Sequence, residues 1–474
     1  MTNAGLTESY WPADNSEALR SITLGGLLRE VAAEVPDRIA LVEAVPDPMK
    51  RRRWTYAELL TDAERAARAL LKHFGSGDCI AFCSPNCAEW IIVQHAVSLA
   101  GMVLAPINPA FREREIQTIL SDSDAAGIFY APKFRDNDIE ATLSVLSARL
   151  PNLKRRIRIE DAAAFFADHD PAEALPDTTP DQVLQIQFTS GTTGTPKGAR
   201  LHHLGVVNST RFVARRAGFP EGGVWLNAMP MFHVGGAVVT AMATLNSRGT
   251  YVLAPAFEPA LMLELIESER ANATLIVPTM ILALLEHPDF KTRDHSSLRV
   301  ILTGAATVPE ALVKRTKDAF GCGVIILFGQ TELNGVVTQT TLDDALEDQV
   351  QTLGRPLPRL EVRIADIGTG ATQPIGVSGE ICVRGYQNMH GYCGPPELTA
   401  SAIDKDGWLH MGDLGAMDSR GYLRITGRLK DMVIRGGMNI YPREIERSSS
   451  RIRRSRTQAS WESRTRNGAR LSRR

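Results

Sequence analysis

The chain has no run of about 18 or more consecutive apolar residues, so its sequence offers no candidate for a transmembrane helix. The first 14 residues lack a basic start followed by an apolar core, which argues against a secretory signal. The six cysteines are spread over 474 residues and do not make a disulfide framework. We therefore expect a cytoplasmic protein.

Three of the cysteines, Cys79, Cys83 and Cys87, are regularly spaced and suggest a metal site as one interpretation. However, the segment from Cys79 to Ser84 has the pattern of a buried strand. Cysteine often serves as a small core residue. The sequence favours a structural role for all three.

Size and charge limit the architecture further. A chain of 474 residues is too long for one hydrophobic core and predicts two or three subdomains. The 44% hydrophobic and 23% charged residues are ordinary for a globular protein. The net charge of −1 hides an asymmetry, because 447–474 holds ten Arg and one acid, Glu462, for a sum of +9. The preceding 446 residues therefore carry −10.

Helical and strand patterns alternate along the chain. Thr55 and Glu58 form the pattern of a capping box, and an apolar helical face follows from Leu59 to Phe74. Further segments are expected as strands at 79–84, 102–107, 126–130, 299–303 and 324–328, and as helices at 87–100, 113–120 and 309–320. This alternation predicts layers of parallel α/β structure, whereas short strands and turns from Leu353 onward predict a smaller β-rich part.

The most informative segment is the Gly- and Thr-rich stretch from Thr189 to Gly198, which follows a strand-like run, 184–188. In that run, apolar residues alternate with two glutamines, as in a half-buried strand. Glycines allow close approach of the backbone to an anion, hydroxyl groups donate hydrogen bonds, and Lys197 adds a positive charge. This is the chemistry of a phosphate-binding loop. It is not a Walker A loop, because Pro196 and Gly198 occupy positions where that motif needs Gly and Ser or Thr.

The stretch resembles the signature loop of the adenylate-forming enzymes, which include acyl-CoA synthetases, adenylation domains and luciferases. The resemblance continues in order over roughly 25–446 and looks closest to bacterial fatty-acyl-CoA synthetases. It implies a layered large domain of two αβ subdomains and a β-rich subdomain at about 353–429. The large domain would span 1–429, and 430–446 would be the hinge and the start of a small domain.

The resemblance also implies roles for individual residues. Glu332 would hold Mg²⁺, Thr331 would contact the α-phosphate, Phe328 would stack on adenine, Asp413 would bind the ribose hydroxyls with Arg428 nearby, and Lys430 would lie at the domain hinge. His233 belongs to a segment, 229–236, that looks like the one lining the family's acyl pocket. The remaining implied cofactor-binding residues are Thr189, Ser190, Gly191, Thr192, Thr193, Gly194, Lys197, Gly304, Ala305, Ala306, Gly329 and Gln330.

The activity implied by the resemblance is attack of a carboxylate on MgATP to give an acyl-adenylate, followed by transfer of the acyl group to coenzyme A. Amino-acid-activating relatives present an Asp where this chain has His233, which argues against an amino-acid substrate. A fatty acid is favoured, and an aryl or alicyclic acid is the alternative. The partners implied are these small molecules, and a homodimer is left open.

The family pattern stops after Glu446. Only 44 residues follow Lys430, and none of them is Lys, whereas the family's small domain needs about a hundred residues and a catalytic lysine. We expect the small domain to be missing and activity to be impaired, and a nucleotide- or acyl-binding remnant without turnover is a further alternative. The Arg- and Ser-rich tail, 447–474, cannot bury enough surface to order itself. A frameshifted or otherwise aberrant end is favoured there over a tail that binds nucleic acid or an anionic membrane.

Overall fold

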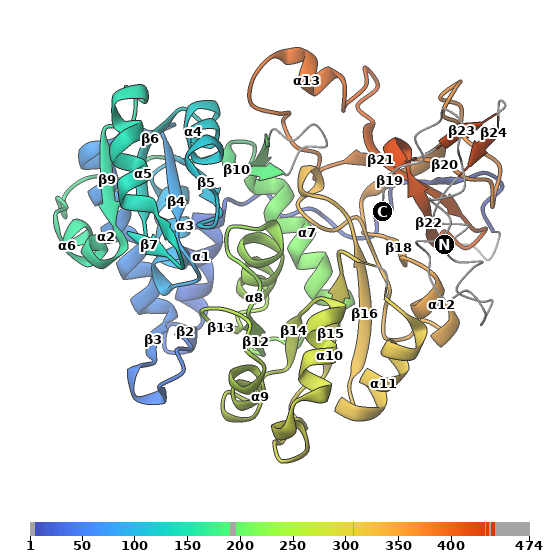
Figure 1. The fold of residues 1–474 in the computed structure, drawn as a ribbon, viewed down its shortest axis with the longest axis horizontal. Helices are drawn as coiled ribbons and strands as arrows, with labels where there is room; N and C mark the ends of the chain where they lie inside the picture. The colour runs from blue at the N-terminus through green and yellow to red at the C-terminus, as the bar shows by residue number, and fades with distance from the viewer. Residues whose placement is uncertain (1–4, 190–195, 307, 432, 436–437, 441–474) are drawn as a thin grey trace.

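The computed structural model describes 5–189, 196–306, 308–431, 433–435 and 438–440. Most of the signature loop, Ser190–Gly194, and the tail predicted at 447–474 lie outside these residues. Three sheets, surrounded by helices, follow one another across the molecule in Figure 1, from the blue and teal N-terminal part to the orange and red β-rich part.

The first sheet has six strands in the order β11-β10-β5-β4-β6-β9. Its strands are parallel except for the antiparallel hairpin of β10 and β11, which flanks the signature loop. Their bounds are β4 Cys79–Cys83, β5 Val103–Ile107, β6 Ala125–Tyr130, β9 Arg155–Arg158, β10 Val183–Thr189 and β11 Lys197–His202.

The second sheet has nine strands in the order β18-β17-β16-β15-β14-β12-β13-β2-β3. The central strands from β16 to β2 are parallel, and antiparallel strands close both edges. Their bounds are β2 Ile39–Glu43, β3 Arg52–Thr55, β12 Val224–Asn227, β13 Thr250–Leu253, β14 Ala273–Leu275, β15 Val300–Gly304, β16 Gly323–Phe328, β17 Thr338–Gln339 and β18 Arg355–Pro356.

The third sheet is antiparallel, with five strands in the order β1-β19-β20-β21-β22. Four of its strands come from the part that the sequence predicts as β-rich, whereas β1 comes from the N-terminus. Their bounds are β1 Tyr10–Trp11, β19 Leu360–Ala365, β20 Gly379–Gly385, β21 Leu409–Met417 and β22 Leu423–Arg428. Two short pairs lie outside the sheets: β7 Lys133–Phe134 with β8 Asn137–Asp138, and β23 Val433–Arg435 with β24 Met438–Ile440.

Helices cover the sheets and fill the space between them. Their bounds are α1 Leu24–Glu34, α2 Tyr56–His73, α3 Ala88–Leu99, α4 Glu113–Asp122, α5 Ile139–Leu146, α6 Ala162–Ala167, α7 His203–Arg216, α8 Ala241–Asn246, α9 Pro259–Ser268, α10 Pro278–Glu286, α11 Glu310–Phe320, α12 Leu346–Gln351 and α13 Pro396–Ala400. Within the described residues, none of them is both long and apolar enough to cross a membrane.

The alternation of side chains along the strands shows how the layers are arranged. In β4, Ile80 and Phe82 join a core cluster with α1, α2, α3, α7 and α8, whereas Cys79, Ala81 and Cys83 join another with α4 and α5. The second sheet contributes to the first of these clusters from one face and packs α9, α10 and α11 on the other. The two larger sheets therefore enclose a shared layer of helices, as in the layered α/β fold predicted from the sequence.

Several local expectations are confirmed. Helix α2 begins at Tyr56, and both hydrogen bonds of the Thr55–Glu58 capping box form. The strands expected near 79–84, 102–107 and 126–130 are β4, β5 and β6. Cys79 and Cys83 are buried core residues whose thiol pKa values burial raises to about 12, as expected for structural cysteines.

Strand β10 differs from its expected half-buried character. Gln185 and Gln187 are both buried, although their positions alternate with apolar residues. They form a chain of hydrogen bonds: the amide of Gln94 on α3 donates to Gln185 (3.3 Å), Gln185 donates to Gln187 (2.5 Å), and Gln187 donates to the carbonyl of Phe232 (2.6 Å). Because the amides satisfy one another, this strand can be buried on both faces.

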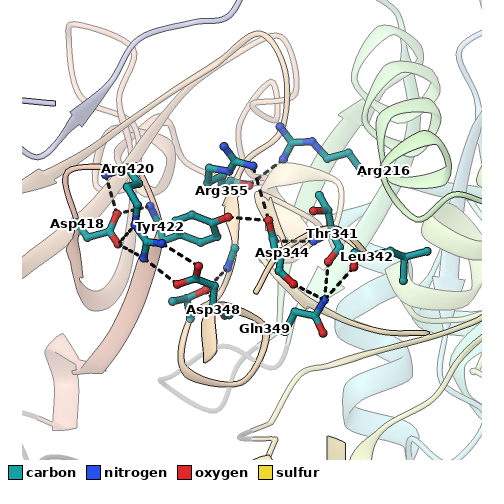
Figure 2. Close-up of polar contacts among 12 residues, drawn as sticks. Arg216, Thr341, Leu342, Asp344, Asp348, Gln349, Arg355, Asp418, Arg420 and Tyr422 are labelled. Carbon is teal, nitrogen blue, oxygen red and sulfur yellow. Dashed lines mark hydrogen bonds and ion pairs between the residues drawn. The ribbon is translucent and has the colours of Figure 1, made fainter. Parts of the chain in front are cut away.

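A polar network joins the third sheet to the second through α12 (Figure 2). Arg420, in the turn before β22, donates two hydrogen bonds to the buried carboxylate of Asp348, at 2.7 and 2.8 Å. The hydroxyl of Tyr422 donates to Asp344 (2.6 Å), and the guanidinium of Arg216 donates to the carbonyl of Arg355 (3.0 Å). These contacts fix the β-rich part against the nine-stranded sheet.

Replacing Asp348 by alanine should lower the free energy of unfolding by about 1–2 kcal/mol, because Arg420 loses a bidentate partner but is itself half exposed. Urea unfolding followed by circular dichroism measures this change. The exposed Asp343, in the loop before α12, offers a matched control, Asp343→Ala, which should change stability little. Equal effects of both substitutions would contradict the structural role of the network.

The free energy of unfolding should also decrease as the pH is lowered, over a range set by two histidines. Burial lowers the pKa of His95, on α3, and of His203, on α7, from 6.5 to about 4. The two histidines therefore bind protons more readily in the unfolded chain than in the folded one. Their contribution to the free energy of unfolding is fully present above pH 6.5 and is lost as the pH falls toward 4. Urea unfolding over this range should show the decline, and His95→Gln should make it shallower. An unchanged slope in that variant would argue against His95 as a contributor.

Candidate active site

A cleft of about 590 Å³ lies where the three sheets meet. Its lining comes from segments far apart in the sequence: the β10–β11 hairpin, the turn after β16, the segment before α13, strand β21 and the end of β22. The lining residues are Thr189, Lys197, Gly329, Gln330, Thr331, Glu332, Tyr392, His410, Met411, Gly412, Asp413, Arg428, Leu429 and Lys430. Nine of these fourteen belong to the set that the sequence analysis singled out.

The β10–β11 hairpin brings the two ends of the signature loop to the cleft. Thr189 and Lys197 are direct cross-strand partners, so the two ends of the signature loop lie close together. Both residues line the cleft. Gly191, Thr192 and the other predicted residues of the loop lie outside the described part of the chain.

The turn after β16 owes its shape to close backbone packing. A Cβ atom on Gly329 would lie 2.5 Å from the carbonyl oxygen of Gly335, so only glycine fits there. A short 3₁₀ helix, Thr331–Leu333, follows and ends at Asn334, whose φ of 56° is left-handed. This turn places Thr331 and Glu332 at the cleft.

Glu332 is a nearly buried carboxylate, with 9% of its surface exposed. One of its oxygens accepts a hydrogen bond of 2.6 Å from the hydroxyl of Tyr392. Burial, and then the neighbouring carboxylate, raises the pKa of Tyr392, so this hydroxyl stays protonated and remains a donor. On its other side, the ring of Tyr392 lies 5.2 Å from the ammonium group of Lys197.

The surroundings of Glu332 fit a divalent cation. Within the part of the chain that the structure describes, its carboxylate forms no ion pair. A buried carboxylate without a cationic partner is costly unless it binds a metal ion. Carboxylate oxygens are ligands that Mg²⁺ accepts together with phosphate oxygens. The residues present therefore suit a magnesium ion delivered with a polyphosphate.

Another part of the cleft lining comes from the third sheet. Asp413 on β21 and Arg428 on β22 are cross-strand partners joined by an ion pair of 3.0 Å. Asp413 is nearly buried, whereas Arg428 is largely exposed. Lys430 follows on the 3₁₀ helix Leu429–Asp431 and also lines the cleft. A carboxylate and two cations therefore line the same cleft as Lys197 and Glu332.

Five of the predicted site residues in the described part of the chain do not line this cleft: His233, Gly304, Ala305, Ala306 and Phe328. Gly304 ends β15 beside β16, and its Cβ would lie 2.4 Å from the carbonyl oxygen of Leu327. Ala305 has a φ of 61°, a left-handed conformation that is uncommon for alanine. His233 is exposed at the surface, yet partial desolvation by the surrounding protein atoms lowers its pKa.

The segment 229–236 lies beside the Glu332 turn. A Cβ atom added at Gly335 would lie 2.8 Å from the side chain of Val239 and 3.3 Å from that of Val234. The same segment runs into a π-helix, Gly235–Thr240, which the sequence does not predict. Such turns of π-helix occur frequently at functional sites. The hydrogen bond from Gln187 to Phe232 ties the segment to β10 as well.

Tyr392 and His410 line the cleft without having been predicted as site residues. His410 is held by Glu380 (2.8 Å) through one ring nitrogen and faces Asp404 (3.5 Å) through the other. It lies only three residues before Asp413, which the sequence analysis named, so a signal for it was available. Tyr392 follows Gly391 in a turn-rich segment, and no pattern in a single sequence connects it with Glu332, sixty residues earlier.

This arrangement fits a class of protein: an α/β nucleotide-binding enzyme whose cleft is lined by the ends of a Gly- and Thr-rich loop and by two carboxylates, Glu332 and Asp413. A family model described as "AMP-binding enzyme" matches 28–393. The chain belongs to the AMP-binding enzyme family.

Individual relatives agree with this assignment. YngI of Bacillus subtilis (strain 168) is 36% identical over 453 residues, covering 90% of this chain and 82% of that protein. The mitochondrial medium-chain acyl-CoA ligase ACSF2 of Homo sapiens is 31% identical over 472 residues, covering 92% and 76%. The ATP-bound crystal structure of MatB from Rhodopseudomonas palustris matches with a TM-score of 0.80 at 28% identity, covering 90% and 83%. The chain is thus homologous to acyl-CoA ligases, and its predicted fold class is confirmed.

Gly329→Ala should disturb the turn that presents Thr331 and Glu332, because the added methyl group meets backbone atoms that cannot move aside cheaply. We expect a loss of about 1–3 kcal/mol in the free energy of unfolding, the usual cost of overpacking, and weaker ATP binding. Urea unfolding and calorimetric titration with ATP measure the two effects. Gly370→Ala is the control, since no atom lies within 4 Å of its added Cβ, although its φ of 71° adds some strain. Unchanged ATP binding in Gly329→Ala would contradict the proposed importance of this turn.

Proposed function

We propose that the chain activates a fatty acid with ATP and passes the acyl group to coenzyme A. The observation that carries this proposal is the convergence on one cleft of Lys197, Thr331, Glu332, Asp413 and Lys430, which come from segments far apart in the chain. Homology to acyl-CoA ligases supports the same reaction.

In the first step, a carboxylate oxygen of the acid attacks the α-phosphorus of ATP. The bond from that phosphorus to the bridging oxygen breaks, and pyrophosphate leaves. Lys197 and the threonine hydroxyls of the signature loop would neutralise and orient the phosphates, and Thr331 would contact the α-phosphate. Asp413 would accept hydrogen bonds from the ribose hydroxyls, as one carboxylate can do in pairs. Positioning and charge neutralisation are the main catalytic tasks in phosphoryl chemistry.

Mg²⁺ is proposed as the metal cofactor, with Glu332 as its protein ligand. When bound, it would neutralise charge on the phosphate oxygens. The chain's own contribution is to hold a carboxylate at the phosphate end of the cleft, in a turn fixed by Gly329.

In the second step, the thiol of coenzyme A loses its proton and attacks the acyl carbonyl, and AMP leaves. Lys430, which follows the last strand of the third sheet, is proposed as the hinge between the large domain, 1–429, and the segment 430–446. A rotation there between the two steps would be a lid-type motion.

A fatty acid is the proposed substrate because the segment beside the Glu332 turn is apolar. Val238 and Val239 are buried, and Met229 and Val234 are half-buried. Phe232 is followed by His233 rather than by an acid that could hold a substrate ammonium group. The name of the human relative, a medium-chain acyl-CoA ligase, points to the same class of acid.

We further propose a cytoplasmic location and small-molecule partners rather than nucleic acid. The absence of a membrane-crossing helix from the described residues is consistent with this location. The acidic charge of residues 1–446 disfavours nucleic-acid binding by that part of the chain. Assembly as a homodimer stays a prediction from the sequence.

The proposal is tested by mass spectrometry after mixing the purified protein with MgATP, coenzyme A and a panel of acids. The panel contains saturated fatty acids of increasing length, benzoate and cyclohexanecarboxylate. Acyl-AMP and acyl-CoA formed preferentially from a fatty acid would support the proposal. Preferential reaction of benzoate or cyclohexanecarboxylate would move the substrate class to aryl or alicyclic acids. ATP binding without any product would identify a nucleotide-binding protein without turnover.

Asp413→Asn should raise the KM for ATP about tenfold while leaving the KM for the acid nearly unchanged, because the ribose loses a charged acceptor. Steady-state kinetics of pyrophosphate release at saturating acid measure the change. Asp406→Asn is a matched control, since Asp406 is an exposed acid of the same β-rich part that does not line the cleft. Equal KM values for ATP in both variants would refute the assignment of Asp413 to the nucleotide.

A further inference from the structure

The segment 385–393, which we call the linking segment, touches all three parts of the molecule. It leaves β20 of the third sheet and pairs along β11 of the first sheet: the amide of His390 donates to the carbonyl of Arg200 (2.9 Å), and Cys393 donates to Gly198 (2.8 Å). It also reaches the turn after β16, where Met389 donates to the carbonyl of Glu332 (2.9 Å). The linking segment therefore joins the strand that carries Lys197 to the turn that carries Glu332.

Tyr392 projects from this segment between the two charged side chains. Its backbone amide donates to the hydroxyl of Thr399 (2.9 Å), and only 8% of the residue is exposed. One end of the side chain donates to Glu332 (2.6 Å), and the ring faces the ammonium group of Lys197 at 5.2 Å. Backbone and side chain are thus both held, and the tyrosine has little freedom to move away.

This placement solves an electrostatic problem. Lys197 and Glu332 carry opposite charges, line one cleft and would gain Coulomb energy by pairing directly. Such a pair would engage the carboxylate that a metal ion needs and the ammonium group that the phosphates need. Tyr392 gives each charge a weaker neutral partner, a hydroxyl for the carboxylate and an aromatic face for the cation. Both groups then remain available to a ligand.

We propose that Tyr392 is a positioning residue: it holds the Glu332 carboxylate ready for the metal ion of a metal–nucleotide complex and keeps it apart from Lys197. This inference rests on the proposed function, in which MgATP is the substrate. Tyr392 acts through Glu332 and Lys197 and takes no part in bond making or breaking. Its hydroxyl engages one carboxylate oxygen and leaves the other for the metal ion.

The test measures the affinity of the full chain for ATP by calorimetry, once with excess Mg²⁺ and once with a chelator. The ratio of the two affinities reports how much Mg²⁺ strengthens ATP binding. This measurement does not require catalytic turnover. Tyr392→Phe removes the hydroxyl and keeps the ring, so the ratio should fall about tenfold, the effect of one hydrogen bond to a charged group. The affinity without metal should change less than about twofold, because the ring still faces Lys197. Raising the Mg²⁺ concentration should restore ATP binding in this variant.

Tyr386→Phe provides a matched control from the same segment. The hydroxyl of Tyr386 is buried and has no hydrogen-bond partner among the described residues, so its removal should leave the Mg²⁺ effect unchanged. A double-mutant cycle adds a second control, because Tyr392→Phe should have no further effect on the ratio once Glu332→Gln is present. A structural role alone would not give this pattern.

The outcomes separate the inference from the proposed function. If the wild-type chain binds ATP more tightly with Mg²⁺ and Tyr392→Phe does so equally well, the inference is wrong and the proposed function stands. An equal loss in Tyr386→Phe would also overturn the inference, since any change in the segment would then suffice. If Mg²⁺ has no effect on ATP binding by the wild-type chain, the proposed metal–nucleotide substrate fails and the inference fails with it.

Discussion

Helix α3 lies between the two larger sheets, and eleven of its twelve residues are buried. Its neighbours α1, α2, α7 and α8 share this layer, and inward-facing residues of both sheets pack on it. Because one layer serves two sheets, neither sheet can shift without losing part of its own core. The β10–β11 hairpin of one sheet and the β16 turn of the other are thereby held across a common cleft. The position of the candidate site thus follows from hydrophobic packing well away from the chemistry.

Polar contacts within that layer refine the positions that packing sets. Gln94 on α3, Gln185 and Gln187 on β10, and the carbonyl of Phe232 form one hydrogen-bonded chain. Burying an amide costs desolvation energy unless the amide is hydrogen-bonded. These paired amides therefore favour one relative placement of α3, β10 and the segment 229–236. Strand β10 leads directly into the signature loop. These hydrogen bonds therefore link the strand before the signature loop to the segment proposed to bind the acyl group.

The sequence predicts local structure well and contacts between distant segments poorly. The capping box at Thr55, the buried strand of Cys79 and the turn carrying Glu332 could each be identified because their signals lie within a few residues. The resemblance to a family supplied roles that spacing alone could not. By contrast, β1 joins the third sheet by pairing with a strand hundreds of residues later in the sequence. The contact of Tyr392 with Glu332 spans 60 positions. The burial of Gln185 and Gln187 was missed because period-two alternation assigns polar residues to the solvent, whereas here they pair with each other.

The two carboxylates of the cleft, Asp413 and Glu332, have different surroundings, which suit the different ligands proposed for them. Asp413 has a cationic neighbour, Arg428, which is largely exposed, so water screens their attraction and a ribose can share the carboxylate at modest cost. Glu332 is nearly as buried, but its hydrogen-bond donor, Tyr392, is neutral. Among the described residues Glu332 has no ion pair that a metal ion would have to break, and a metal ion would compensate its buried charge. Under the proposed function, the metal–nucleotide complex would supply the countercharge that the described residues do not give this carboxylate.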